Sequence, residues 1–253
     1  MFAEPPVATA FRAPPVVPKA GWRGRDPLIG MGILVAGFVL ISTLLVAFVT
    51  ALDLKGDGQD FAAAIFTIAF EVFFGLSVLM LARRRHINLA QLGFRRPDRW
   101  APVGIAVAGS YSVLLGYGIA IQALHELGVD TGIFEGGNSI PIDEGSDTLP
   151  LVGLLVIFGV AVVAVAPLAE EIFFRGLLFR ALDGVWPSWA AIAVSGLAFG
   201  AFHVNLAVLL PFTIIGMLFA WAFKASGSLW VSITAHFIIN TVSLIVTVIG
   251  VLN

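Results

Sequence analysis

Two adjacent glutamates and an arginine interrupt one of the most apolar stretches of this chain. The motif reads Glu170-Glu171-Ile-Phe-Phe-Arg175, and residues 149–169 before it carry no charged side chain. A charge near the centre of a bilayer costs about 2.5–3.5 kcal/mol on insertion scales, so acids in such a position are candidates for function. We therefore expect the chemistry of this protein to lie at this motif.

The spacing within the motif separates the two glutamates. Glu171 and Arg175 are four residues apart, with the acid on the amino-terminal side, which favours an ion pair along one face of a helix. Glu170 points about 100° away from its neighbour and has no partner nearby in the sequence. We expect Glu171 and Arg175 to neutralise each other and support the site, and Glu170 to remain free to act as a general base.

His203 ends a later apolar stretch, four residues after Phe199. Residues four apart share a helix face, and Gly196 and Gly200 in the same stretch would let a second helix approach closely. A lone histidine at the end of a span is commonly an ordinary interfacial residue. Its candidacy as a catalytic residue, with Phe199 in support, therefore depends on the other motifs.

His236 and Asn240 belong to a polar stripe in the last apolar stretch. Steps of three and four residues place the stripe along one side of a helix. We expect this side to face the bundle interior, because lipid would leave its hydrogen bonds unmade. Helix packing is a serious alternative role for the serines and threonine but a weaker one for the histidine. The stripe consists of Ser232, His236, Asn240, Ser243 and Thr247.

A carboxylate, two imidazoles and an amide in a buried pocket are suited to hydrolysis. In one version Glu170, with His203, takes a proton from water, while His236 and Asn240 donate hydrogen bonds to the developing oxyanion. In the other version Glu170, His203 and His236 bind a divalent cation such as zinc as an open three-ligand site that activates water. The sequence leaves both versions open.

Several other chemistries are excluded or disfavoured. The chain contains no cysteine, which rules out disulfides, thiolate catalysis and cysteine zinc sites. It has no HExxH motif and no GxSxG motif, so a zinc-protease helix is absent and serine chemistry is disfavoured. The net charge of −2 and the lack of a basic stripe give no reason to expect nucleic acid as a partner.

The composition indicates a polytopic membrane protein. Hydrophobic residues make up 59% of the 253 residues and charged residues 12%, against about 45–50% and about 25% in soluble chains. Mean hydropathy is +0.99. So few charges could not cover the surface of a soluble domain of this size, and the lipid bilayer is the expected surrounding.

Apolar runs of about 20 residues predict helices that span the membrane. The fourth run continues past Pro167 to Leu182, either as one kinked helix or as a helix followed by an amphipathic segment. We therefore predict an all-α transmembrane bundle of about seven or eight spans, with the active site buried between the later helices. The runs are 28–52, 61–82, 101–124, 149–168, 189–203, 206–223 and 229–252.

The chain is expected to form one membrane domain behind a short tail. Residues 1–26 are proline-rich and predicted to be a disordered cytoplasmic tail, and 27–253 a single membrane domain with its catalytic core at 149–245. Residues 126–147 hold no Lys or Arg, whereas basic residues crowd the tail and the loop after the second span. By the positive-inside rule the amino terminus is cytoplasmic. We expect a multi-pass protein of a bacterial plasma membrane.

The three motifs, in this order and spacing, resemble those of the CPBP family. This family comprises the CAAX prenyl endopeptidases and the bacteriocin-processing or immunity (Abi-type) membrane proteins. The motifs are Glu-Glu-x-x-x-Arg at 170–175, Phe-x-x-x-His at 199–203 and His-x-x-x-Asn at 236–240. The short segments 92–97 and 227–230 agree, so that the resemblance covers about 89–245.

The resemblance implies an intramembrane endopeptidase, glutamate- or metal-dependent, that cleaves a membrane-associated protein or peptide. Carried over by position, the catalytic residues are Glu170, His203, His236 and Asn240, and the supporting residues are Glu171, Arg175 and Phe199. Specificity for prenylated substrates does not follow, because no motif residue reads a lipid. The oligomeric state is not indicated by any pattern.

Two other hypotheses compete with the protease. A non-proteolytic membrane scaffold or bacteriocin self-immunity protein would keep the motifs for packing. A transporter would use Glu71, an acid in the second span, and Glu170 as proton carriers, but the chain lacks the inverted repeat found in many transporters. For Glu71 we expect a structural hydrogen bond.

Overall fold

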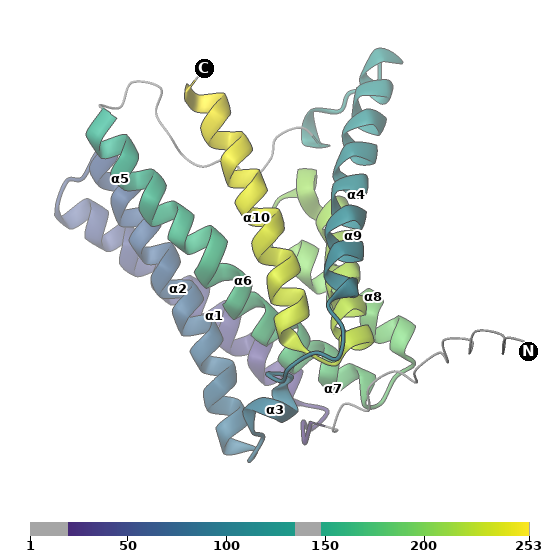
Figure 1. Ribbon diagram of the computed structural model, residues 1–253. Helices are drawn as coiled ribbons and strands as arrows, with labels where there is room; N and C mark the ends of the chain where they lie inside the picture. The colour runs from purple at the N-terminus through teal and green to yellow at the C-terminus, as the bar shows by residue number, and fades with distance from the viewer. Residues whose placement is uncertain (1–19, 135–147, 253) are drawn as a thin grey trace, which may run out of the picture.

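The computed structural model describes residues 20–134 and 148–252, and within these ranges the chain is helical with no strand. The predicted all-α polytopic bundle is confirmed (Figure 1). The elements are α1 Asp26–Ala51, α2 Asp57–Arg84, α3 Leu89–Leu92, α4 Ala101–Glu126, η1 Gly132–Phe134, α5 Thr148–Gly159, η2 Val160–Val165, α6 Ala166–Glu171, η3 Ile172–Phe179, α7 Arg180–Asp183, α8 Ser188–Phe202, α9 Leu206–Ser226 and α10 Leu229–Leu252.

Each of the seven predicted apolar runs is helical, but one is short. In the described part of the chain, six helices are long and apolar enough to cross a membrane. The fifth run forms α8, whose 15 residues extend about 22 Å at 1.5 Å per residue, less than the roughly 30 Å of a hydrocarbon core. Within the described residues there are therefore six helices of spanning length and the shorter apolar helix α8, where seven or eight full spans were expected.

The fourth apolar run continues as one helix through the glutamate motif, from α5 to the end of α7. Two π-helical segments, η2 and η3, lie on either side of α6, and π-bulges are frequent at functional sites. Pro167 has no N–H to donate. The carbonyl of Val162, five residues earlier, instead accepts a hydrogen bond of 2.8 Å from the Asn240 amide of α10. The π-helical turn of η2 is thus stabilised by a hydrogen bond from α10.

Helices α8 and α9 form a tightly packed antiparallel pair. A Cβ atom added at Gly196 would lie 2.6 Å from the carbonyl oxygen of Thr213. One added at Gly200 would lie 2.6 Å from that of Leu209. Only a residue without a side chain fits these contacts, so the predicted close approach at the two glycines is confirmed. The close contact fixes the carboxyl end of α8, where His203 follows.

The residues just before α1 contact the helices at one end of the bundle. The indole nitrogen of Trp22 donates a hydrogen bond of 2.8 Å to the carbonyl of Gly176 in η3. Asp26 is buried and lies 2.6 Å from the Arg85 guanidinium. Of the predicted tail, residues 1–19 lie outside the described residues, and the segment that follows is held by these contacts.

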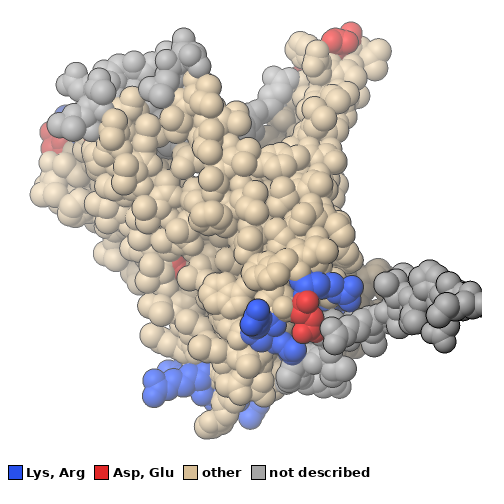
Figure 2. All heavy atoms as spheres, viewed as in Figure 1, with Lys and Arg blue, Asp and Glu red and all other residues tan. Residues whose placement is uncertain are grey.

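Basic side chains gather at this end of the bundle. Arg83 and Arg84 lie in the last turn of α2 and Lys224 in the last turn of α9. Figure 2 shows most of the visible Lys and Arg side chains over the lower end, where α3 and α7 also lie in Figure 1. The carboxyl end of α4, at Glu126, lies at the opposite end. This separation of charges agrees with the alternating loops of the sequence.

The glycine contacts between α8 and α9 give a prediction about stability. Gly200→Ala would place a methyl group against backbone atoms, and overpacking of this kind costs about 1–3 kcal/mol. The measurement is thermal unfolding in detergent. Gly104→Ala in α4 is the matched control, because no atom lies within 4 Å of its added Cβ and alanine is the better helix former. Equal unfolding temperatures for the two variants would contradict the packing account.

Candidate active site

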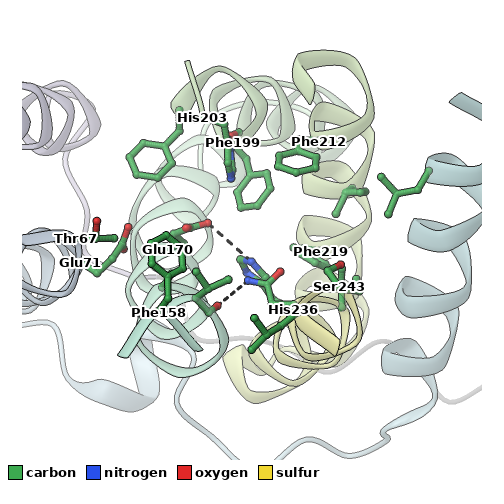
Figure 3. A pocket seen from close by; sticks show the side chains of 18 of the residues that line it. Thr67, Glu71, Phe158, Glu170, Phe199, His203, Phe212, Phe219, His236 and Ser243 are labelled. Carbon is green, nitrogen blue, oxygen red and sulfur yellow. Dashed lines mark hydrogen bonds and ion pairs between the residues drawn. The ribbon is translucent and has the colours of Figure 1, made fainter. Parts of the chain in front are cut away.

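One cavity of about 420 Å³ lies between the helices and brings together the residues of all three motifs. Four of its lining residues are the predicted catalytic group: Glu170 from α6, His203 after α8, and His236 and Asn240 from α10. Figure 3 shows Glu170 and His236 directed toward one another. The other lining residues are mostly apolar. The polar stripe on α10 reaches this cavity through Asn240, Ser243 and Thr247, while Ser232 is buried.

Glu171 and Arg175 form the expected ion pair behind the cavity. Both side chains are fully buried, and Arg175 Nη1 lies 2.8 Å from Glu171 Oε1. Arg175 Nη2 donates a second bond of 2.8 Å to the carbonyl of Gly216 in α9. The rings of Phe199 and Phe219 lie 4.8 Å and 5.3 Å from the guanidinium carbon. The predicted intrahelical pair is thus confirmed, and it also joins α9 to the motif.

His236 lies between the two glutamates. Its Nδ1 is 3.3 Å from Glu171 Oε1, and its Nε2 is 4.0 Å from Glu170 Oε2. The ring is stacked on Phe219 at a centroid distance of 4.9 Å. A carboxylate that is paired with an arginine can only accept, so Nδ1 carries the hydrogen and the ring is fixed with Nε2 toward Glu170.

His203 is oriented by its own helix. Its Nδ1 lies 2.9 Å from the carbonyl oxygen of Phe199. A carbonyl can only accept, so Nδ1 is the donor and the neutral ring presents the lone pair of Nε2. The ring is held edge-on against Phe212 at 4.6 Å and Phe202 at 5.7 Å. Phe199 therefore supports the site twice, through its carbonyl to His203 and through its ring to Arg175.

Asn240 has a second role that the sequence analysis did not anticipate. One of its amide N–H groups is bonded to the carbonyl of Val162. The amide has two such hydrogens, so one remains for the cavity that Asn240 lines. The signal for this contact was present in the sequence: Pro167 leaves one backbone carbonyl without its usual donor.

Glu71 of α2 lines the same cavity, which corrects the expectation of a structural hydrogen bond. Its side chain is buried, and Oε2 has no hydrogen-bond partner among the residues that the structure describes. Figure 3 shows Glu71 and Thr67 on one side of Glu170 and His236 on the other. No motif contains Glu71, and only its charge within an apolar run marked it.

In their present positions, the side chains that line the cavity do not form a metal-binding site. Metal-binding histidines typically donate one ring N–H to a carbonyl or carboxylate, and His203 and His236 both do so. However, within the described ranges no three His, Asp or Glu side chains are grouped closely enough to hold one ion. Glu170, His203 and His236 would have to move together to bind zinc.

The buried ion pair gives a prediction about folding. Arg175→Met would leave Glu171 in the protein interior with its charge uncompensated, and breaking a buried pair in this way costs about 3–5 kcal/mol. The double variant Glu171→Gln/Arg175→Met removes both charges and should recover part of this loss. Thermal unfolding of the purified variants in detergent measures both effects. A double variant that is less stable than the single one would show that the charge pairing is not what Arg175 contributes.

Comparison with known proteins agrees with the motifs. Residues 152–242 match the protein-family model described as type II CAAX prenyl endopeptidase Rce1-like. Over 137 residues the chain is 31% identical to a protein of Bacillus subtilis (strain 168) that is named "Putative membrane peptidase YdiL". The alignment covers 54% of this chain and 52% of that protein, so the chain spans about half the length of the curated relative that it matches.

No solved structure matches the chain. The segment that matches the family model contains all three motifs, from the glutamate pair to Asn240, and includes every predicted catalytic residue. Its helices α6, α8, α9 and α10 all contribute residues to the lining of the cavity. Over this segment the chain is similar to the family described as type II CAAX prenyl endopeptidase Rce1-like.

Proposed function

We propose that this protein is an intramembrane endopeptidase that hydrolyses a peptide bond of a membrane-associated protein or peptide. The observation that carries the proposal is the convergence of Glu170, His203 and His236 on one cavity whose walls are otherwise mostly apolar. Three groups able to exchange protons are costly inside a bilayer, and such groups mark functional sites.

In the proposed reaction Glu170 is the general base. The attacking water is held between Glu170 and the Nε2 lone pair of His203, and the cavity of about 420 Å³ has room for water beside a peptide. The water oxygen adds to the carbonyl carbon, and one water proton passes to Glu170. When the C–N bond breaks, this proton passes to the leaving nitrogen, so that an acid and an amine are formed.

His236 and Asn240 are the proposed donors to the oxyanion of the tetrahedral intermediate. Glu171 holds the ring with Nε2 on the side of Glu170. In this role His236 is doubly protonated, so that Nδ1 donates to Glu171 and Nε2 donates to the oxyanion. Asn240 contributes the amide hydrogen that is not bonded to Val162. Donors fixed in advance around a developing charge are worth about 10²–10³-fold in kcat each.

The pairing of Arg175 is essential to this division of roles. Arg175 is the fully buried cation at the motif, and its Nη1 and Nη2 are bonded to Glu171 and to the Gly216 carbonyl. Glu170 therefore makes no direct ion pair with it among the described contacts. An acid that is not locked in an ion pair can accept and release a proton during each turnover.

The proposed substrate is reached from the membrane. The outward-facing helices expose large apolar side chains, as lipid-facing surfaces do. The basic end of the bundle is proposed to face the cytoplasm, with the amino terminus on the same side, and the membrane is proposed to be a bacterial plasma membrane. The partners are thus the bilayer and a membrane-associated polypeptide, with no role for nucleic acid.

A non-proteolytic scaffold is favoured by only part of the site. Arg175 and Asn240 both bind backbone carbonyls and so stabilise the packing of α9 and α10. The buried Oε2 of Glu170 has no hydrogen-bond partner within the described structure, as is also true of Glu171 Oε2 and Arg175 Nε. Of these three residues, Glu170 is the one that lines the cavity. An unpaired buried oxygen weakens packing and is expected where a reacting molecule binds.

If the protein is an endopeptidase, the Glu170→Gln variant should fold normally and no longer cleave its substrate. Loss of a general base lowers the rate by about 10²–10⁴-fold. Membrane fractions of cells that express the wild type or the variant are compared by mass spectrometry of peptide termini, and we expect termini that depend on Glu170. Glu126→Gln, which changes an exposed acid at the end of α4, is the control.

Two results of this experiment would overturn the assignment. Identical termini from the wild type and a folded Glu170→Gln variant would leave the scaffold as the better hypothesis. If Glu171→Gln abolished cleavage while Glu170→Gln did not, the roles of the two adjacent glutamates would be reversed.

We further predict that no metal is required. Purified protein is dialysed against a chelator, its metal content is measured by elemental analysis, and its activity is followed on a library of quenched fluorescent peptides in detergent micelles. Activity should persist without metal, since the described side chains form no three-ligand group. Activity that disappears and returns with one equivalent of zinc would instead establish the metal version, with Glu170, His203 and His236 as ligands.

A further inference from the structure

Among the described residues that line the cavity, Glu71 is the one carboxyl that neither the motifs nor the proposed reaction uses. It lies in α2, which is outside residues 152–242, the segment that matches the protein-family model. Its side chain is only 5% exposed, as is that of Glu170, and both line the cavity. Figure 3 shows the two side chains entering from neighbouring helices.

A glycine brings the two acids together. A Cβ atom added at Gly75 of α2 would lie 3.3 Å from the Cα of Ala169 in α6. The two helices therefore approach closely at this point. Glu71 lies one turn before Gly75 on the same face of α2, and Glu170 directly follows Ala169. The crossing places one carboxyl beside the other.

Among the described residues, the two carboxyls have no cation of their own. Both line the same cavity, Figure 3 shows them next to each other, and the Oε2 atom of each is buried with no hydrogen-bond partner within the described ranges. The nearby cation of the motif, Arg175, is bonded to Glu171 and Gly216. His203 and His236 are the other ionisable groups that face the pair. Neighbouring carboxyls in a low dielectric do not both ionise, so one of them holds a proton.

We propose that Glu71 is this protonated acid and that it positions Glu170, donating through one bridging water a hydrogen bond that holds the Glu170 carboxylate toward His236. The assignment rests on the proposed function, in which Glu170 must be ionised to accept a proton. The hydrogen on Glu71 donates to the bridging water, and that water donates to Glu170. Glu71 itself gains and loses no atom in the reaction.

Two substitutions test whether a hydrogen-bond donor is needed at position 71. Glu71→Gln keeps a donor in the same place, so its kcat should stay within about threefold of the wild-type value. Glu71→Met keeps the volume without a donor, and misplacement of a catalytic group costs about 10²-fold in rate. We expect that loss in kcat with KM unchanged, measured on the quenched peptide that the wild type cleaves fastest.

Stability separates positioning from packing. Replacing a buried ionisable group by an apolar one of similar volume is commonly neutral or stabilising, so Glu71→Met should unfold at the wild-type temperature or above. Ser77→Ala is the matched control. Ser77 lies in the same helix and does not line the cavity, and its hydroxyl is bonded to the carbonyl of Phe74 in its own helix, so kcat should not change.

Infrared spectroscopy tests whether Glu71 is protonated, and it does so without an activity measurement. The wild type should show the carbonyl stretch of a buried protonated carboxyl, and Glu71→Gln should lack it. Retention of this band in Glu71→Gln would overturn the assignment, as would a folded Glu71→Met variant with wild-type kcat, or a Glu71→Gln variant as slow as Glu71→Met. These outcomes are distinct from failure of the proposed function, in which Glu170→Gln would remain active.

Discussion

The fully buried ion pair between Glu171 and Arg175 is the interaction on which the rest of the site depends. Charges of opposite sign in the interior are stable only when their remaining hydrogen-bonding capacity is used. Here part of that capacity joins three helices, because Arg175 also binds a carbonyl of α9 and Glu171 also holds His236 of α10. Glu171 Oε2 and Arg175 Nε have no hydrogen-bond partner among the described residues. A pair formed within one helix thus determines where the neighbouring helices lie.

The same ion pair gives the two adjacent glutamates different roles. One acid is neutralised and orients an imidazole, whereas its neighbour keeps a free oxygen toward the cavity. The two histidines are oriented alike, each through Nδ1, although one acceptor is a carboxylate and the other a backbone carbonyl. The cavity therefore receives two Nε2 atoms and one carboxylate in fixed directions, which is the preorganisation that catalysis requires.

The features that could be predicted from the sequence are those that depend on the spacing of residues along one helix. The pairing of Glu171 with Arg175, the glycine contacts before His203 and the inward side of the α10 stripe all follow from a period of 3.6 residues. Contacts that depend on how two helices cross were not predicted. The environment of Glu71 is determined by Gly75 against Ala169, and the Asn240 contact by a carbonyl on another helix. The run at 189–203 was predicted with the length that α8 has, 15 residues, but it was counted as a full span although a span needs about 20.

The shortness of α8 has a consequence for the surrounding bilayer. A helix of 15 residues is about 8 Å shorter than a hydrocarbon core of roughly 30 Å, and lipid adjusts to such a hydrophobic mismatch by thinning locally. The thinned annulus would lie beside the turn at His203, where Val204 is 86% exposed. A hydrolase inside a membrane consumes one water per bond cut, and locally thinner lipid at this turn would bring bulk water closer to His203, the residue proposed to bind it.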